Sequence, residues 1–131
     1  MSPNDGYLPY WLVFTSILAL AHSIICYIAS PQTSLKQFSG PNHPPPTPLL
    51  AHIYGIKNVY TALIRLYAAM NVGNRELYDL ALLTYVGVLF MSVTEMFVWK
   101  TMRGKEAAFP LFNAGVGLVW MIGMRGWYVG A

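Results

Sequence analysis

The feature that most constrains the fold is a set of four long apolar runs with very few charged residues. These runs cover about residues 8–28, 49–70, 77–99 and 107–129. Each is close to the ~20 residues that a helix needs to cross a hydrocarbon core of ~30 Å. Only 10% of the residues are charged, whereas a soluble domain carries about 25%. The sequence therefore predicts an all-α integral membrane four-helix bundle that forms a single domain over residues 1–131.

Prolines mark where the helices and the first connection are expected. Pro9, Pro48 and Pro110 fall in what we expect to be first turns, where a missing backbone N–H is tolerated. A proline-rich loop over residues 30–48 separates the first two runs. Its three adjacent prolines favour an extended polyproline conformation, so we expect a short spacer on the membrane surface.

The distribution of basic residues gives an expected orientation. Four of them fall on the side of the first and third loops, and two on the side of the second loop and both termini. The four are Lys36, Lys100, Arg103 and Lys105, and the two are Arg75 and Arg125. Because cytoplasmic loops carry an excess of Lys and Arg, the first and third loops are expected to face the cytoplasm.

Several polar side chains fall within the apolar runs. Ionisable residues cost a few kcal/mol each at membrane depth and need a partner or a function. At a rise of ~1.5 Å per residue, His22, Lys57, Glu95 and Asn113 share a layer roughly 6–12 Å below the side of the first and third loops. His22 could be structural, hydrogen-bonded to a backbone carbonyl or to Asn113, because a histidine surrounded by lipid needs a partner.

Two interpretations of this layer remain open. In the first, Lys57–Glu95 and Arg65–Asp79 are structural ion pairs that join neighbouring helices, with snorkelling to the interface as an alternative for Arg65. In the second, His22, Lys57 and Glu95 form a catalytic acid–base site that transfers protons to or from an oily substrate.

Other side chains near this layer could bind such a substrate. The candidates are Tyr54, Asn58, Thr61 and Asn113. We predict no metal, because His22, His52 and Glu95 do not follow a recognisable ligand spacing. No phosphate-binding loop is present, and we predict no cofactor. The basic residues are scattered rather than clustered, which argues against a nucleic-acid partner and leaves membrane lipid as the expected environment.

Five segments carry a resemblance to a known family. They are GYLPYWLVFTSI near the start, HIYG and IRLYAAM in the second run, TEMFVWKT at the end of the third, and LVWMIGMRGWYVG at the end. In matching order, they resemble the ergosterol biosynthetic protein 28 family. The resemblance implies a small four-span protein of the endoplasmic reticulum membrane and a non-catalytic scaffold that tethers sterol C-4 demethylation enzymes. Gly55, Arg65 and Glu95 match family residues.

The departures from the family fall at polar positions. The resemblance implies an asparagine in place of His22, an arginine in place of His52, a Trp-Thr pair in place of Lys57 and Asn58, and a histidine in place of Met91. These departures favour a paralogue that serves another lipophilic pathway, such as terpenoid or meroterpenoid synthesis. Two functions therefore stay open. One is a scaffold that binds sterol or terpenoid pathway enzymes, and the other is an isomerase or cyclase acting on a terpenoid, meroterpenoid or sterol-like substrate.

Overall fold

The structure belongs to the all-α class, as predicted, with helices and no strand among residues 5–130. The structure is a computed structural model that describes residues 5–130, so residues 1–4 and 131 of the expected 1–131 domain lie outside the described residues. Its helices are α1 (Leu8–Ile28), α2 (Pro31–Ser34), α3 (Pro48–Met70), α4 (Arg75–Phe97) and α5 (Gly104–Val129). The predicted apolar runs correspond to the four long helices within a few residues at each end.

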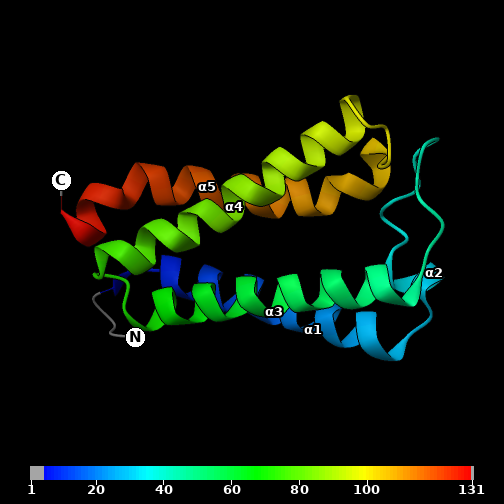
Figure 1. Cartoon of the computed structure of the whole chain (residues 1–131). Coiled ribbons are helices and arrows are strands. Elements are labelled where there is room, and N and C mark those ends of the chain that lie inside the picture. Colours follow the sequence, from blue (N-terminus) through cyan, green and yellow to red (C-terminus); the bar gives the residue numbers. More distant parts are fainter. Residues whose placement is uncertain (1–4, 131) are drawn as a thin grey trace.

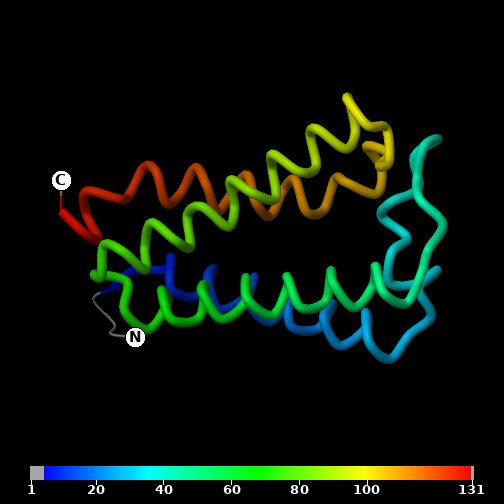
Figure 2. Tube along the Cα trace, in the orientation of Figure 1, coloured from blue at the N-terminus to red at the C-terminus, as the bar shows by residue number. Residues whose placement is uncertain are grey.

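The long helices alternate in direction and form two neighbouring pairs, α1 with α3 and α4 with α5 (Figures 1 and 2). The α3–α4 turn lies at the same end as the beginning and the end of the described chain. Helix α2, the proline-rich loop and the α4–α5 loop lie at the opposite end. Long helices that follow one another along the chain pack as neighbours, which gives this up-and-down order.

Within residues 5–130, three helices are long and apolar enough to cross a membrane, namely α1, α4 and α5. The prediction of a fourth span is not confirmed. Helix α3 has 23 residues, as many as α4, but it carries Lys57, Asn58 and Arg65 in its central turns. These polar side chains lower its mean hydropathy, so length alone does not identify it as a span.

Two of the three prolines begin helices as expected. Pro48 is the first residue of α3, and Pro9 is the second residue of α1. The prediction for Pro110 is wrong, because α5 begins at Gly104 and Pro110 lies inside it. Proline has no backbone N–H, so Pro110 cannot donate the usual helical hydrogen bond to the carbonyl of Glu106.

The main hydrophobic core joins the two pairs near the α3–α4 turn. Leu8 and Leu12 of α1 pack there with Tyr78 and Tyr85 of α4. Tyr85 is fully buried, and its hydroxyl is 2.8 Å from Thr15 Oγ1 of α1, which links the pairs directly. The helices therefore make close contact in this half of the molecule.

At the opposite end the proline-rich loop and the α4–α5 loop are joined by backbone hydrogen bonds. Gly40 N–H donates to the carbonyl of Thr101 at 2.9 Å, and Asn42 N–H donates to that of Lys100 at 3.0 Å. The first and third loops thus lie together, as the predicted topology requires. The first loop is not extended throughout, because it begins with the one-turn helix α2, whose first turn is capped by the Ser30 hydroxyl.

Candidate functional site

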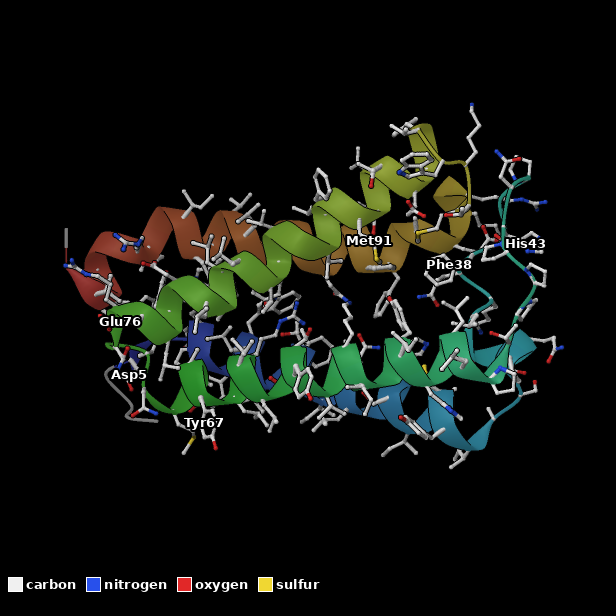
Figure 3. All side chains as sticks on the ribbon, in the orientation of Figure 1. Asp5, Phe38, His43, Tyr67, Glu76 and Met91 are labelled. Atoms are coloured by element: carbon white, nitrogen blue, oxygen red, sulfur yellow. The ribbon has the colours of Figure 1, made fainter. Side chains whose placement is uncertain are left out.

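A cavity of about 520 Å³ lies between the α1–α3 pair and the α4–α5 pair. All four long helices and the segment after α2 contribute to its walls. In Figure 3, Phe38 lies at the loop end of the space between the pairs, and Tyr67 points away from it on the outer side of α3. Seven of the predicted site residues line the cavity, namely His22, Tyr54, Lys57, Asn58, Thr61, Arg65 and Asn113.

His22 is held by hydrogen bonds at both ring nitrogens. Its Nε2 lies 2.9 Å from the carbonyl oxygen of Ser34, and its Nδ1 lies 2.9 Å from Asn58 Nδ2. A carbonyl can only accept and an amide nitrogen can only donate, so this arrangement selects a neutral ring with the proton on Nε2. The predicted bond to a backbone carbonyl is thus present, and the side-chain partner is Asn58 rather than Asn113.

Lys57 and Glu95 do not form the predicted ion pair. Lys57 Nζ donates to Asn58 Oδ1 at 3.3 Å and lies 4.9 Å from the centre of the Tyr54 ring. Glu95 Oε1 instead accepts from the Thr101 hydroxyl at 2.9 Å, and Glu95 does not line the cavity. The prediction was wrong because similar depth does not make two helix faces point toward each other.

Arg65 and Asp79 also have other partners than predicted. Arg65 is 6% exposed, so it does not snorkel; its Nε donates to Thr84 Oγ1 at 2.9 Å. Its guanidinium carbon lies 4.1 Å from the centre of the Tyr85 ring, a cation–π contact. Asp79 accepts two hydrogen bonds of 2.8 Å from Arg125 of α5. This bidentate pair joins α4 to α5 and occupies the carboxylate that we expected Arg65 to use.

Glu106 lines the cavity although the sequence analysis did not identify it. Its Oε2 atom is buried and has no hydrogen-bond partner within the described residues. The sequence predicts that the fourth run begins at about residue 107, with Pro110 in its first turn, so Glu106 is expected in the third loop. The spacing of Glu106, Pro110 and Asn113, which is i, i+4, i+7, is the signal that could have placed all three on one helix face.

The cavity thus combines polar groups from α1, α3 and α5 with apolar walls. Its groups with acid–base capacity include His22, Lys57 and Glu106, whereas Glu95 is not among them. Within residues 5–130, no group of three or more His, Cys, Asp or Glu side chains is placed to hold a metal ion. The arrangement suits an amphipathic small molecule held by hydrogen bonds and charge.

Comparisons with known proteins agree with the motifs. The sequence model of the family described as "Erg28 like protein" matches residues 8–119. Three proteins named Ergosterol biosynthetic protein 28 are similar. That of Candida albicans is 31% identical over 127 residues, which cover 96% of this chain and 91% of that protein. That of Saccharomyces cerevisiae is 31% identical over 126 residues, 95% of this chain and 84% of that protein.

The protein of Gibberella zeae is 28% identical over 155 residues, and that match covers 95% of this chain and 91% of the relative. No solved structure matches this chain. The family match extends from the first residue of α1 well into α5, so it includes most of the cavity-lining helices. With nearly the whole chain aligned to these relatives, the protein belongs to the Erg28-like family.

Proposed function

We propose that this protein is a non-catalytic scaffold of the endoplasmic reticulum membrane, which tethers enzymes of sterol or terpenoid biosynthesis near their lipophilic substrate. The observation that carries this proposal is the family match over residues 8–119. Relatives that align with almost the whole chain bear the name Ergosterol biosynthetic protein 28. The match spans the helical body rather than one motif, which favours a shared overall role.

The geometry of the predicted catalytic residues supports a non-catalytic role. Glu95 is bonded to Thr101 and does not line the cavity where His22 and Lys57 lie. Both ring nitrogens of His22 are engaged by protein groups. A general base must reach the proton that it removes, within hydrogen-bond distance or through one water. In this arrangement His22 acts as a packing residue that joins α1 to α2 and α3.

We further propose that α3 crosses the membrane together with the other three long helices. Its outward side carries exposed apolar residues at helical spacing, namely Ile53, Ile56, Tyr60, Leu63 and Tyr67. Its cations line the cavity instead of facing outward. A helix with polar groups on its inner side and apolar groups on its outer side suits a position between lipid and a polar interior.

Affinity purification tests the scaffold. A tagged chain is expressed at its native level, extracted in a mild detergent and purified, and the bound proteins are identified by mass spectrometry. We expect enrichment of membrane-bound sterol or terpenoid enzymes over a purification of an unrelated multi-span protein of the same membrane. Deletion of the chain should lower pathway output while the same enzymes, assayed singly, stay active. Unchanged pathway output together with no enriched enzyme would refute the scaffold.

One observation favours a second candidate, a small acid–base isomerase or cyclase. His22, Lys57 and Glu106 line the same cavity, beside Tyr54 and Asn58. His22→Asn separates the two functions, because asparagine can hydrogen-bond but cannot exchange a proton near neutral pH. In the scaffold, product formation should follow the amount of folded protein. In the enzyme, it should fall by about 10²-fold or more at unchanged protein level.

A further inference from the structure

The two cations that α3 contributes to the cavity wall have only neutral partners among the described residues. Lys57 and Arg65 lie two helical turns apart on α3, and both line the cavity. Lys57 donates to the Asn58 amide oxygen, and Arg65 donates to the Thr84 hydroxyl. Among residues 5–130, neither cation has a carboxylate oxygen within 4.0 Å. Charged groups removed from bulk water are costly unless an opposite charge lies close by.

The cavity wall as a whole also carries a net positive charge. Its basic members are Lys36, Lys57 and Arg65, and its acidic member is Glu106. This leaves a formal excess of two positive charges. Glu106 itself has a buried carboxylate oxygen without a hydrogen-bond partner among the described residues, so it does not neutralise either cation by direct contact. The cavity wall therefore carries more positive than negative charge.

Arg65 is held in a fixed position that suits ligand binding. Its guanidinium carbon lies 4.1 Å from the centre of the buried Tyr85 ring, and Nε is used by Thr84. Arginine has five N–H groups, and the single bond from Nε leaves the four on its terminal nitrogens. A planar pair of nitrogens binds a carboxylate or phosphate group through two parallel hydrogen bonds. Packing against Tyr85 reduces the entropy lost when such a group binds.

The rest of the cavity is suited to an apolar body. Leu18 and Ala19 of α1, Val88 of α4 and Phe109 of α5 contribute to its walls. Its volume of about 520 Å³ lies within the roughly 300–1,000 Å³ that is usual for small-molecule sites. A molecule dissolved in the membrane could enter between the helix pairs without crossing water.

We propose that this cavity binds an amphipathic anion, a molecule with an apolar body and one carboxylate or phosphate group that Lys57 and Arg65 hold. The ligand is either a free lipophilic acid or an anionic membrane lipid, since both present the same chemistry. This inference goes beyond the scaffold and does not depend on it. The two proposals can therefore fail separately. A scaffold that binds no anion would enrich partner enzymes in the affinity purification but show no competed labelling in the crosslinking experiment described below. A protein that binds an anion but no partner enzymes would give the opposite pair of results.

Photo-crosslinking tests the proposal. The purified full chain is placed in phosphatidylcholine nanodiscs and labelled with a fatty acid that carries a diazirine, and the labelled residues are mapped by mass spectrometry. We expect labels on cavity-lining segments of α1, α3 and α5. Excess oleate should compete, whereas oleyl alcohol, which has the same chain and no charge, should not. Equal competition by oleyl alcohol would overturn the proposal.

Variants identify the groups that hold the anion. Loss of one charge-assisted hydrogen bond should weaken binding roughly ten- to a hundredfold. We expect this for Lys57→Met and Arg65→Gln, whereas Lys57→Arg should retain most labelling. Lys105→Met is the matched control, because Lys105 is exposed and does not line the cavity. If Arg65→Gln does not fold, the comparison of Lys57→Met with Lys57→Arg still tests the site. Labelling of Lys57→Met at the wild-type level would refute the assignment of Lys57 as a group that holds the anion.

A second arm distinguishes the two sources of the anion. The same nanodiscs are prepared with dioleoyl phosphatidate in place of part of the phosphatidylcholine. If phosphatidate suppresses labelling in the wild type, the cavity takes a lipid headgroup. If labelling persists and only oleate competes, the ligand is a free lipophilic acid. Either result supports an anion site, provided that Lys57→Met weakens the labelling as expected.

Discussion

The close approach of α5 to Tyr85 leads to a sharp prediction for Gly117. A Cβ atom added at Gly117 would lie 2.7 Å from Tyr85 Cζ and 2.8 Å from both Cε atoms. The ring cannot move away freely, because Tyr85 is fully buried, bonded to Thr15 and covered by Arg65. We therefore expect Gly117→Ala to destabilise the protein, although alanine is the better helix former.

Two opposing effects determine whether Gly117→Ala raises or lowers the free energy of unfolding. Replacing glycine by alanine inside a helix stabilises it by about 1 kcal/mol through helix propensity. Forcing an additional carbon into a packed core costs about 1–3 kcal/mol. Gly123→Ala is the matched control, because it lies in the same helix and an added Cβ would meet nothing within 4 Å. We expect Gly117→Ala to be about 2 kcal/mol less stable than Gly123→Ala.

The free energy of unfolding can be measured by titrating SDS into detergent micelles and following tryptophan fluorescence. Gly123→Ala should unfold at the same or a higher SDS fraction than the wild type, and Gly117→Ala at a lower one. A smaller residue at position 85, introduced by Tyr85→Leu, should remove the penalty of Gly117→Ala. Equal stability of the two alanine variants would refute the packing argument.

Three further predictions concern contacts between the helices and loops. In a double-mutant cycle, Tyr85→Phe and Thr15→Val should show a coupling energy of about 0.6 kcal/mol, the average for interhelical hydrogen bonds in membranes. Additive effects on the free energy of unfolding would show that the 2.8 Å contact between Tyr85 and Thr15 is not a stabilising hydrogen bond. Asp79→Asn should cause a small loss of stability that shrinks at high salt, because the bond with Arg125 is partly exposed; a loss independent of salt would contradict this. Gly40→Ala should separate the proline-rich loop from the α4–α5 loop, because the added Cβ would overlap the backbone of the α4–α5 loop. Limited proteolysis should then cleave both loops faster than in the wild type.

The features predicted correctly from the sequence are those that depend on length and depth. Apolar runs of spanning length gave the four long helices, because each run is bounded by prolines or polar turns. The rise per residue placed His22, Lys57 and Asn113 in one layer, and all three line the cavity. Depth along a helix follows from residue counting alone.

The features predicted wrongly depend on rotation about the helix axis and on one proline. Apolar side chains are spread evenly around α4, so nothing in its sequence indicates which side Glu95 or Asp79 occupies. Arg125 is expected at the same end of the bundle as Asp79, but depth alone does not predict the ion pair that the two residues form. Pro110 is tolerated within α5, and taking it as a helix start concealed Glu106. Facing directions are set by packing between helices, which a single sequence does not record.

The pairing of α1 with α3 has a consequence for biogenesis. Helix α3 is the long helix that falls short of the apolar threshold met by the other three. Its buried small residues, such as Gly55 and Ala62, pack closely in the protein, and Gly55 approaches Cys26 and Ser23 of α1. If α3 spans the membrane as we propose, α1 emerges before it during synthesis and can already lie in the bilayer, so that α3 has a partner as it enters. In that case the order of the helices along the chain lets the hydrophobic α1 accompany the more polar α3 into the membrane, before α4 and α5 cover its cations.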